Sequence, residues 1–187
     1  MLTILGKRSS INVRKVLWTC EEAGLAYQQE DYGSGFKPLD TPEFQRLNPN
    51  SLVPVLLDDD FVLWESNSIC RYLARKAERH DLLPAEPHAC ANVERWMDWQ
   101  ATEFNNAWRY AFMGLVRKDP RFQDSAAIKE SIAAWTRCVQ IVNTQLQQTG
   151  AWITGSEFTL ADIVLGLSVH RWKMTPFALP KMAEVEH

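Results

Sequence analysis

The stretch SLVPVLLDDDFVLWES, residues 51–66, decides the first half of the fold. Two short apolar runs, Val53–Leu57 and Phe61–Trp64, flank three consecutive aspartates, a pattern that predicts an antiparallel hairpin. Glu65 and Ser66 then separate the second strand from a helical pattern, and Ser66 has the side chain of a helix N-cap. We therefore expect a hairpin that is followed directly by a helix.

The residues before this stretch are arranged as strand, helix, strand and short helix. Leu2–Gly6 is an apolar run that predicts a buried strand. Apolar residues then recur at helical spacing from Asn12 to Gly24, a residue type that favours a helix C-terminus. Ala26–Tyr32 can form a second strand, and a short helix fits Pro42–Leu47. With the hairpin and its helix, the predicted order is β-α-β-α-β-β-α.

The second half of the chain carries only helical patterns. Two prolines in Leu82–Pro87 indicate a linker, which divides the chain into an N-terminal domain over 1–80 and a C-terminal domain over 88–187. Two stretches beyond it have apolar residues at helical spacing: Val93, Trp96, Met97, Ala101 and Phe104, then Ile128, Ile132, Trp135, Val139, Val142 and Leu146. The polar segment Arg117–Asp124 between them predicts an antiparallel helical hairpin, so we expect an all-α second domain.

The composition is that of a folded protein, and its net charge gives no positive electrostatic field that would attract polyanions. Of its 187 residues, 46% are hydrophobic and 23% are charged, and the formal net charge is -3. These values speak against nucleic acid and an anionic membrane surface as partners. Lys7 and Arg8 follow Met1–Leu5 directly, which leaves no apolar stretch for a signal peptide, so we expect a cytoplasmic protein.

The four cysteines, Cys20, Cys70, Cys90 and Cys138, are scattered singly. No C-x-x-C pair and no histidine at zinc-ligand spacing accompanies them, so neither a disulfide framework nor a metal site is predicted. Cys20 and Cys70 fall within apolar helical patterns, where a free cysteine packs as a small hydrophobe. We expect both in the core.

Pro54 stands at the head of an apolar strand, where a residue without a backbone N–H is normally excluded from the middle of a sheet. One interpretation is an edge strand. The other is a cis Val53-Pro54 bond that turns the Val53 main chain outward, so that it can pair with an extended peptide ligand as an added strand would. The sequence pattern leaves both open.

Glu65 and Ser66 also have two interpretations. Ser66 can simply cap the following helix. Alternatively, the Ser66 hydroxyl and the first helical N–H groups hold a ligand carboxylate, while Glu65 accepts from a ligand ammonium. A zwitterionic amino-acid end would satisfy both parts of this second interpretation.

Ser9, Ser10 and Asn12 lie between the first strand and the first helix. They fit turn and cap positions. A thiolate placed at this helix N-terminus would also be stabilised there, by a hydroxyl hydrogen bond and by the partial positive charge of the helix. Lowering a thiol pKa from about 8.5 to roughly 6.5 corresponds to some 2.7 kcal/mol, which one oriented donor and a helix terminus can supply.

Together these features resemble the cytosolic glutathione S-transferases, in particular bacterial theta-like members of the serine or asparagine type. The resemblance rests on Ser10, Val53-Pro54, Glu65-Ser66 and the capping-box segment Thr159–Asp162, and it spans the whole chain. It implies a thioredoxin-like, glutathione-binding N-terminal domain followed by an all-helical C-terminal domain. Family members usually begin a further helix where this chain ends, so we expect a shortened C-terminal domain.

By position, the resemblance implies that Ser10 stabilises the glutathione thiolate, with Asn12 as a second contact to the thiol and Ser9 as the alternative hydroxyl. The implied glutathione-binding residues are Ser9, Lys37, Asn50, Ser51, Val53, Pro54, Glu65 and Ser66. Other members carry Gln and His at the positions of Asn50 and Ser51, a departure that bears on affinity for the glycyl end.

The resemblance also implies an electrophile pocket between the two domains. Its lining from the first long helix of the second domain would be Asn106, Arg109, Tyr110 and Met113. Aromatic residues at helical spacing are equally typical of a core. A cation at Arg109 beside an apolar pocket would favour an anionic substrate such as a haloacid.

The implied activity is transfer of glutathione, activated as thiolate, to a small electrophile in a detoxification reaction. Glutathione is the cosubstrate, and no separate cofactor is implied. Two alternatives stay open: a glutathione-dependent disulfide or peroxide reductase, and a non-catalytic binding or regulatory module of the same fold. Because family members are usually homodimers, we expect a two-fold dimer.

Overall fold

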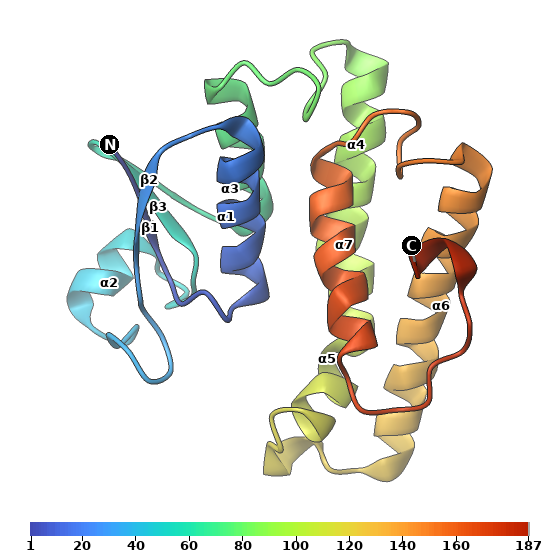
Figure 1. Ribbon diagram of the computed structural model, residues 1–187. Coiled ribbons are helices and arrows are strands. Elements are labelled where there is room, and N and C mark those ends of the chain that lie inside the picture. The colour runs from blue at the N-terminus through green and yellow to red at the C-terminus, as the bar shows by residue number, and fades with distance from the viewer. Residues whose placement is uncertain (187) are drawn as a thin grey trace. The chain divides into compact units, whose positions relative to one another are not determined.

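The computed structural model describes residues 1–186, which form two compact units, Met1–Ala85 and the residues from Glu86 onward. The first unit combines a four-stranded sheet with helices, and the second is helical (Figure 1). This confirms the predicted fold class of an α/β domain followed by an all-α domain. None of the helices in this part of the chain is both long and apolar enough to span a membrane.

The first unit has the predicted β-α-β-α-β-β-α order. Its elements are β1 Leu2–Leu5, α1 Ile11–Ala23, β2 Tyr27–Glu30, α2 Pro42–Leu47, β3 Val55–Asp58, β4 Phe61–Trp64 and α3 Ser66–Lys76. The strand order in the sheet is β2-β1-β3-β4, with β2 parallel to β1 and the other two pairings antiparallel. Helices α1 and α3 cover one face of the sheet, and α2 lies on the other (Figure 1).

Apolar side chains and two cysteines fill much of the space between the sheet and helices α1 and α3. Ile4, Leu56 and Ile69 are fully buried, and so are Cys20 of α1 and Cys70 of α3, as predicted. Burial raises the pKa of the Cys20 thiol to about 12 and that of Cys70 to about 11, because a thiolate would lose its hydration there. Both cysteines therefore act as small apolar side chains.

Helix α2 closes the opposite face through one aromatic residue. Phe44 is buried against Leu5 and Val55, and partly buried apolar side chains surround this cluster. The helix begins where the sequence predicts, because Thr41 Oγ1 accepts from the Phe44 N–H at 3.3 Å and Pro42 occupies its first turn.

Over residues 86–186 the second unit has four α-helices and three shorter helical segments. They are α4 Pro87–Trp99, the π-helical segment Gln100–Phe104, α5 Asn105–Leu115, the 3₁₀ turn Pro120–Phe122, α6 Ser125–Thr149, α7 Leu160–Lys173 and the 3₁₀ turn Ala183–Val185. The predicted hairpin is present between α5 and α6, where Ser131 Oγ donates to the Ala107 carbonyl at 2.6 Å and accepts from the Ala111 N–H at 3.0 Å. The π-helical segment was not predicted. Its Gln100 is fully buried and donates to Ser168 Oγ of α7 at 2.8 Å.

Candidate functional site

The strand registers bring the predicted site segments to one end of the sheet. Leu5 of β1 is opposite both Glu30 of β2 and Val55 of β3, and Val55 is in turn opposite Trp64 of β4. The chain therefore leaves β1, β2 and β4, and enters β3, at the same end. The loops that carry the predicted glutathione contacts all start or finish there.

Ser10 holds the N-cap position of α1 without using its side chain as a cap. Its N–H donates to the Lys7 carbonyl at 3.0 Å, and its own carbonyl accepts from the Arg14 N–H at 2.9 Å. Within residues 1–186 neither the Ser10 hydroxyl nor the half-buried Asn12 amide makes a side-chain hydrogen bond, and Ser9 is exposed beside them. These polar groups are available to a ligand at the helix N-terminus.

Gly6 connects this loop to the segment before β3. Its backbone φ of 144° suits glycine, and a Cβ there would lie 2.5 Å from Val13 Cγ2 and 2.9 Å from Val53 Cβ. The Gly6 carbonyl also accepts from Gln29 Nε2 at 2.6 Å. The close approach that glycine allows places Val53 directly against the start of the Ser10 loop.

The Val53-Pro54 peptide bond is cis, as the second interpretation of Pro54 predicts. The edge-strand interpretation is wrong, because β3 lies between β1 and β4 and its ladder begins only at Val55. The turn and loop hydrogen bonds among residues 1–186 include none to or from the Val53 main chain. A donor and an acceptor are therefore available beside Gly6.

Asn48 organises the turn that leads to Val53, a role that the sequence interpretation missed. It is 3% exposed, and its Oδ1 accepts from both the main-chain N–H and the side-chain amide of Asn50, at 3.0 and 3.2 Å. Its Nδ2 donates to the Leu52 carbonyl at 2.8 Å, and Ser51 takes a positive φ of 53° between them. An Asn-Pro pair at residues 48–49 is a turn signal that could have pointed to it.

Glu65, not Ser66, holds the N-cap position of α3, so the predicted capping role of Ser66 is wrong. The chain turns sharply out of β4 by giving Glu65 a φ of 74°, which costs a residue with a side chain about 1–3 kcal/mol. Ser66 is consequently the first helical residue and is buried, while the exposed Glu65 carboxylate makes no capping bond. Strained backbone of this kind is concentrated at binding sites.

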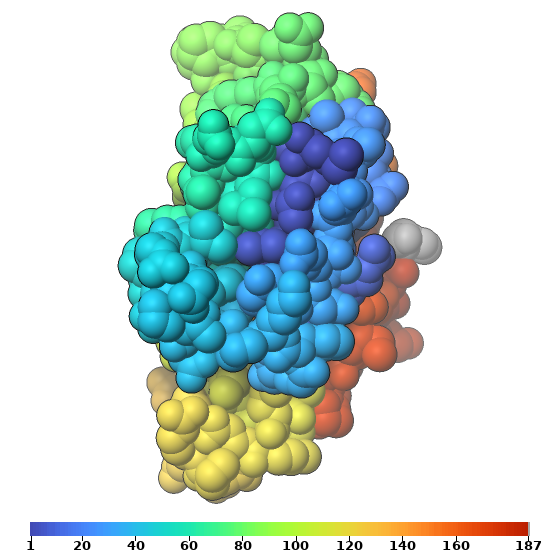
Figure 2. Space-filling view, turned by 90° about the vertical axis from the view of Figure 1, so that its left-hand side faces the viewer, coloured from blue at the N-terminus to red at the C-terminus, as the bar shows by residue number. Residues whose placement is uncertain are grey.

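Ser51 shares a pocket with the loop after β2. The other lining residues are Gly33, Ser34, Gly35, Phe36, Pro38, Leu39 and Asp40, and Figure 2 shows this loop and α2 side by side in blue and cyan. Lys37 does not line the pocket. Its ammonium lies 2.7 Å from the Glu30 carboxylate and 5.1 Å from the centre of the Tyr32 ring, and the Glu30 hydrogen bond raises the Lys37 pKa.

The four predicted electrophile contacts all lie on α5 of the second unit. Asn106, Arg109, Tyr110 and Met113 share one face of the helix, because their spacing corresponds to one and two helical turns. Asn106 and Arg109 are exposed. The Tyr110 ring packs edge-on against the Phe122 ring, with 5.1 Å between the ring centres. Their role in an electrophile pocket stays a prediction.

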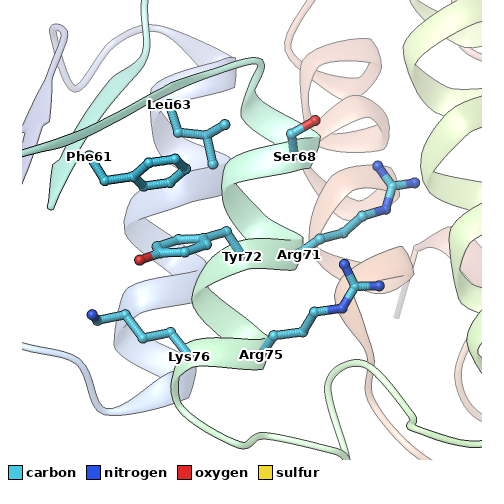
Figure 3. Close-up of a pocket in the computed structure, with 7 residues that line it drawn as sticks. All are labelled: Phe61, Leu63, Ser68, Arg71, Tyr72, Arg75 and Lys76. Carbon is cyan, nitrogen blue, oxygen red and sulfur yellow. The ribbon is translucent and has the colours of Figure 1, made fainter.

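A further pocket, which was not predicted, lies between β4 and α3. Its lining is Phe61, Leu63, Ser68, Arg71, Tyr72, Arg75 and Lys76, and in Figure 3 the Phe61 and Tyr72 rings face each other while the two arginines point away from them. Asp58 Oδ2 accepts from the Tyr72 hydroxyl at 2.5 Å and lies 2.7 Å from Lys76 Nζ. The lining of the pocket includes none of the predicted glutathione contacts.

Comparison with known proteins decides the family. Residues 1–75 match the family model described as the N-terminal domain of glutathione S-transferase. Over 167 residues the chain is 40% identical to glutathione S-transferase GstB of Escherichia coli (strain K12), an alignment that covers 88% of this chain and 80% of that protein. The chain belongs to the glutathione S-transferase family.

This member of the glutathione S-transferase family is also similar to one solved structure and to one elongation factor subunit. A theta class glutathione S-transferase from Xanthomonas axonopodis pv. citri, solved with glutathione bound, matches with a TM-score of 0.92 and 38% identity over 99% of this chain and 88% of that chain. Elongation factor 1-gamma 3 of Oryza sativa subsp. japonica is 32% identical over 133 residues, 70% of this chain but 30% of that protein. The predicted family and its thioredoxin-like first domain are confirmed.

Proposed function

We propose that this member of the glutathione S-transferase family activates glutathione as a thiolate at Ser10 and Asn12 and directs it to a small electrophile. The observation that carries the proposal is the Ser10 hydroxyl, which stands at the N-terminus of α1 without a protein partner among residues 1–186. A hydroxyl donor and the partial positive charge of the helix both favour the ionised thiol over the neutral one.

The rest of the tripeptide would follow the convergent loops. The Val53 main chain, beside the cis bond to Pro54, can pair with the cysteinyl unit as an added strand would. Glu65 would accept from the γ-glutamyl ammonium, and Ser66 with the first N–H groups of α3 would hold its carboxylate. In this proposal, the positive φ of Glu65 serves ligand binding.

The glycyl end would lie near the pocket that Ser51 shares with the loop over 33–40. Asn50 and Ser51 are the contacts from the turn, and Ser9 is the alternative hydroxyl at the thiol. Lys37 can bind the glycyl carboxylate only by exchanging its contact with Glu30 for one with the ligand. Its contribution to affinity is therefore the smallest of the set.

Calorimetric titration of glutathione tests the binding part of this proposal. The wild-type protein should bind, and a Glu65→Ala, Ser66→Ala double variant should lose at least tenfold in affinity, since a charged hydrogen bond contributes about 1.5–3 kcal/mol. Ser68→Ala on the exposed side of α3 is the matched control and should bind normally. Absence of binding to the wild type would contradict the proposal and favour a non-catalytic module.

Turnover rates with two kinds of substrate distinguish the transferase activity from the alternative reductase activity. The Asn12 amide supports the reductase as a second candidate. It is half-buried and makes no side-chain hydrogen bond within residues 1–186. A second donor of this kind can stabilise a thiolate leaving group as well as a thiolate nucleophile. Rates with a haloaromatic electrophile and with a glutathione-linked disulfide should be compared. A haloaromatic rate that Ser10→Ala lowers at least tenfold supports transfer, and turnover of the disulfide alone supports reduction.

The proposal includes a homodimer in the cytoplasm. Phe61, Val62 and Trp64 of β4 are 47%, 36% and 37% exposed, which is an unusual run of large apolar side chains for a surface strand. Covering them with a second copy would remove this surface from water. Sedimentation at micromolar concentration should give a dimer, and a Phe61→Glu variant should give a monomer.

A further inference from the structure

Lys7 connects the loop that leads to Ser10 with the loop that follows β2. Its main-chain carbonyl accepts from the Ser10 N–H at 3.0 Å, and its N–H donates to the Tyr32 carbonyl at 3.1 Å. Its side-chain ammonium donates to the Ser34 carbonyl at 3.3 Å, and Ser34 lines the pocket of the loop over 33–40. Lys7 therefore lies between the proposed thiol position and the pocket proposed for the glycyl end.

No carboxylate of the described chain balances the charge of Lys7. Its ammonium has the neutral Ser34 carbonyl as its partner and makes no ion pair with these residues. Lys37, a cation within the pocket loop, lies 2.7 Å from the Glu30 carboxylate, so an anion that approaches Lys37 also approaches a negative charge. The pocket lining adds a further carboxylate, that of Asp40. An anion bound here therefore needs a cation, and the charge of Lys7 is available for it.

The proposed position of glutathione brings its glycyl carboxylate within reach of Lys7. The cysteinyl unit would pair with the Val53 main chain, and a Cβ atom on Gly6 would lie 2.9 Å from the Val53 Cβ. Lys7 directly follows Gly6, so their Cα atoms are about 3.8 Å apart. In an extended tripeptide the glycyl carboxylate carbon lies about 5 Å from the cysteinyl Cα. The flexible four-carbon stem of a lysine can cover the remaining distance.

We propose that Lys7 binds the glycyl carboxylate of glutathione and is the main cation at that end of the ligand. To do so, its ammonium exchanges the Ser34 carbonyl for a carboxylate, which adds Coulomb attraction to the hydrogen bond. Ser34 is exposed, so water can bind its carbonyl after the exchange. The inference rests on the proposed function, because it assigns a further binding residue of the same site.

Glutathione and its glycyl monoethyl ester test this assignment, because the ester lacks the glycyl carboxylate but keeps the thiol and the γ-glutamyl end. In calorimetric titrations the wild type should bind glutathione about fivefold more tightly than the ester, the size expected for one ion pair near the surface. Lys7→Met should bind glutathione about fivefold more weakly than the wild type and should no longer distinguish the two ligands. Lys7→Gln removes the charge but keeps a donor for Ser34, and it should behave like Lys7→Met.

Arg8→Met is the matched control. Arg8 is the adjacent exposed cation, and its Nε donates to Gln29 Oε1 at 3.0 Å, so this variant should keep the wild-type affinity for both ligands. Lys37→Met should keep the preference for glutathione over the ester. An unchanged preference in Lys7→Met, or a lost preference in Lys37→Met, would overturn the inference.

Other outcomes distinguish the charge of Lys7 from its other effects. Wild-type affinities in Lys7→Gln would show that the contact with Ser34 matters and the charge does not. Equal weakening of both ligands in Lys7→Met, with a raised pKa of the bound thiol in ultraviolet titration, would assign Lys7 to the thiolate. Either result overturns the inference. A wild type that binds glutathione and the ester equally overturns it and leaves the proposed function intact, whereas a wild type that binds neither ligand overturns both.

Discussion

Gly6 and Val53 are in contact so close that a Cβ atom on Gly6 would lie 2.9 Å from the Val53 Cβ. This contact is where the thiol end of the candidate site, on the loop to Ser10, meets the main chain that precedes Pro54. The close packing of this glycine thus sets the spacing between two segments of the candidate site that are far apart in sequence.

A Gly6→Ala substitution should disturb stability and binding together. The methyl group meets Val13 and Val53, and the φ of 144° is strained for alanine, so we expect a loss of about 2–4 kcal/mol in the free energy of unfolding. Gly24→Ala is the control, because its φ of 67° is strained but nothing lies within 4 Å, and it should cost only about 1 kcal/mol. Denaturant unfolding and glutathione titration check both, and equal losses in the two variants would contradict the packing argument.

Substitutions of Glu65 can separate the cost of its strained backbone from the contribution of its carboxylate to binding. Glycine accepts a φ of 74° freely whereas alanine does not, so Glu65→Gly should be more stable than Glu65→Ala by about 1 kcal/mol. Both variants lose the carboxylate and should lose glutathione affinity to the same degree. If Glu65→Gly kept wild-type affinity, the carboxylate would have no part in binding.

Asp58 should make part of the stability dependent on pH. Hydrogen bonds from Lys76 and then Tyr72 lower the pKa of its carboxyl group in the folded state. The stabilisation is therefore complete above the ordinary aspartate pKa of about 3.9 and is lost as pH falls through the lower folded-state value. Asp58→Asn should be less stable than wild type by a constant amount from pH 5 to 7, and the difference should shrink below about pH 4.

The control for this series is Asp60→Asn, an exposed aspartate of the same hairpin turn, whose unfolding curve should follow wild type at every pH. Tyr72→Phe removes one of the two hydrogen bonds and should cost about 1–2 kcal/mol at pH 7. A difference between wild type and Asp58→Asn that stays constant down to pH 2 would show that the carboxylate is not the group that titrates.

Asp162 should be a second strong determinant of stability. Its carboxylate accepts from the main-chain N–H groups of Ile153 and Thr159, both at 2.8 Å. Replacing it with alanine leaves two buried donors without partners, and we expect a loss of about 2–4 kcal/mol in thermal or denaturant unfolding. Glu157→Ala, an exposed acidic residue of the same loop, should change stability by less than about 0.5 kcal/mol.

Sequence patterns predicted those elements whose causes are local. Gly24 ends α1 through its own left-handed backbone, and Thr41 and Pro42 begin α2 through contacts within four residues. Each signal depends on neighbours along the chain, so one sequence suffices to detect it. The cis bond before Pro54 was one of two interpretations, and only the position of β3 inside the sheet excludes the other.

The missed features depend on distant parts of the molecule. Ser66 fits an N-cap by residue type, but the path from β4 into α3 requires a positive φ at Glu65, which displaces Ser66 into the helix. Lys15 is 1% exposed in the folded chain, yet nothing in its neighbours along the sequence distinguishes it from an exposed lysine. The position of Ser10 and Asn12 at a helix N-terminus could be predicted because it is a local feature, whereas their role at a thiol stays a prediction.

The π-helical segment Gln100–Phe104 changes what the following helix presents to its surroundings. A π-turn accommodates one residue more than an α-turn, so everything after it is rotated by about 100° around the helix axis relative to an uninterrupted α-helix. Loss of a single residue from this segment would restore regular geometry without breaking the helix. Asn106 and Arg109 of α5 would then face a different direction, so a one-residue deletion here would change which side chains α5 presents on a given side while every helix survived.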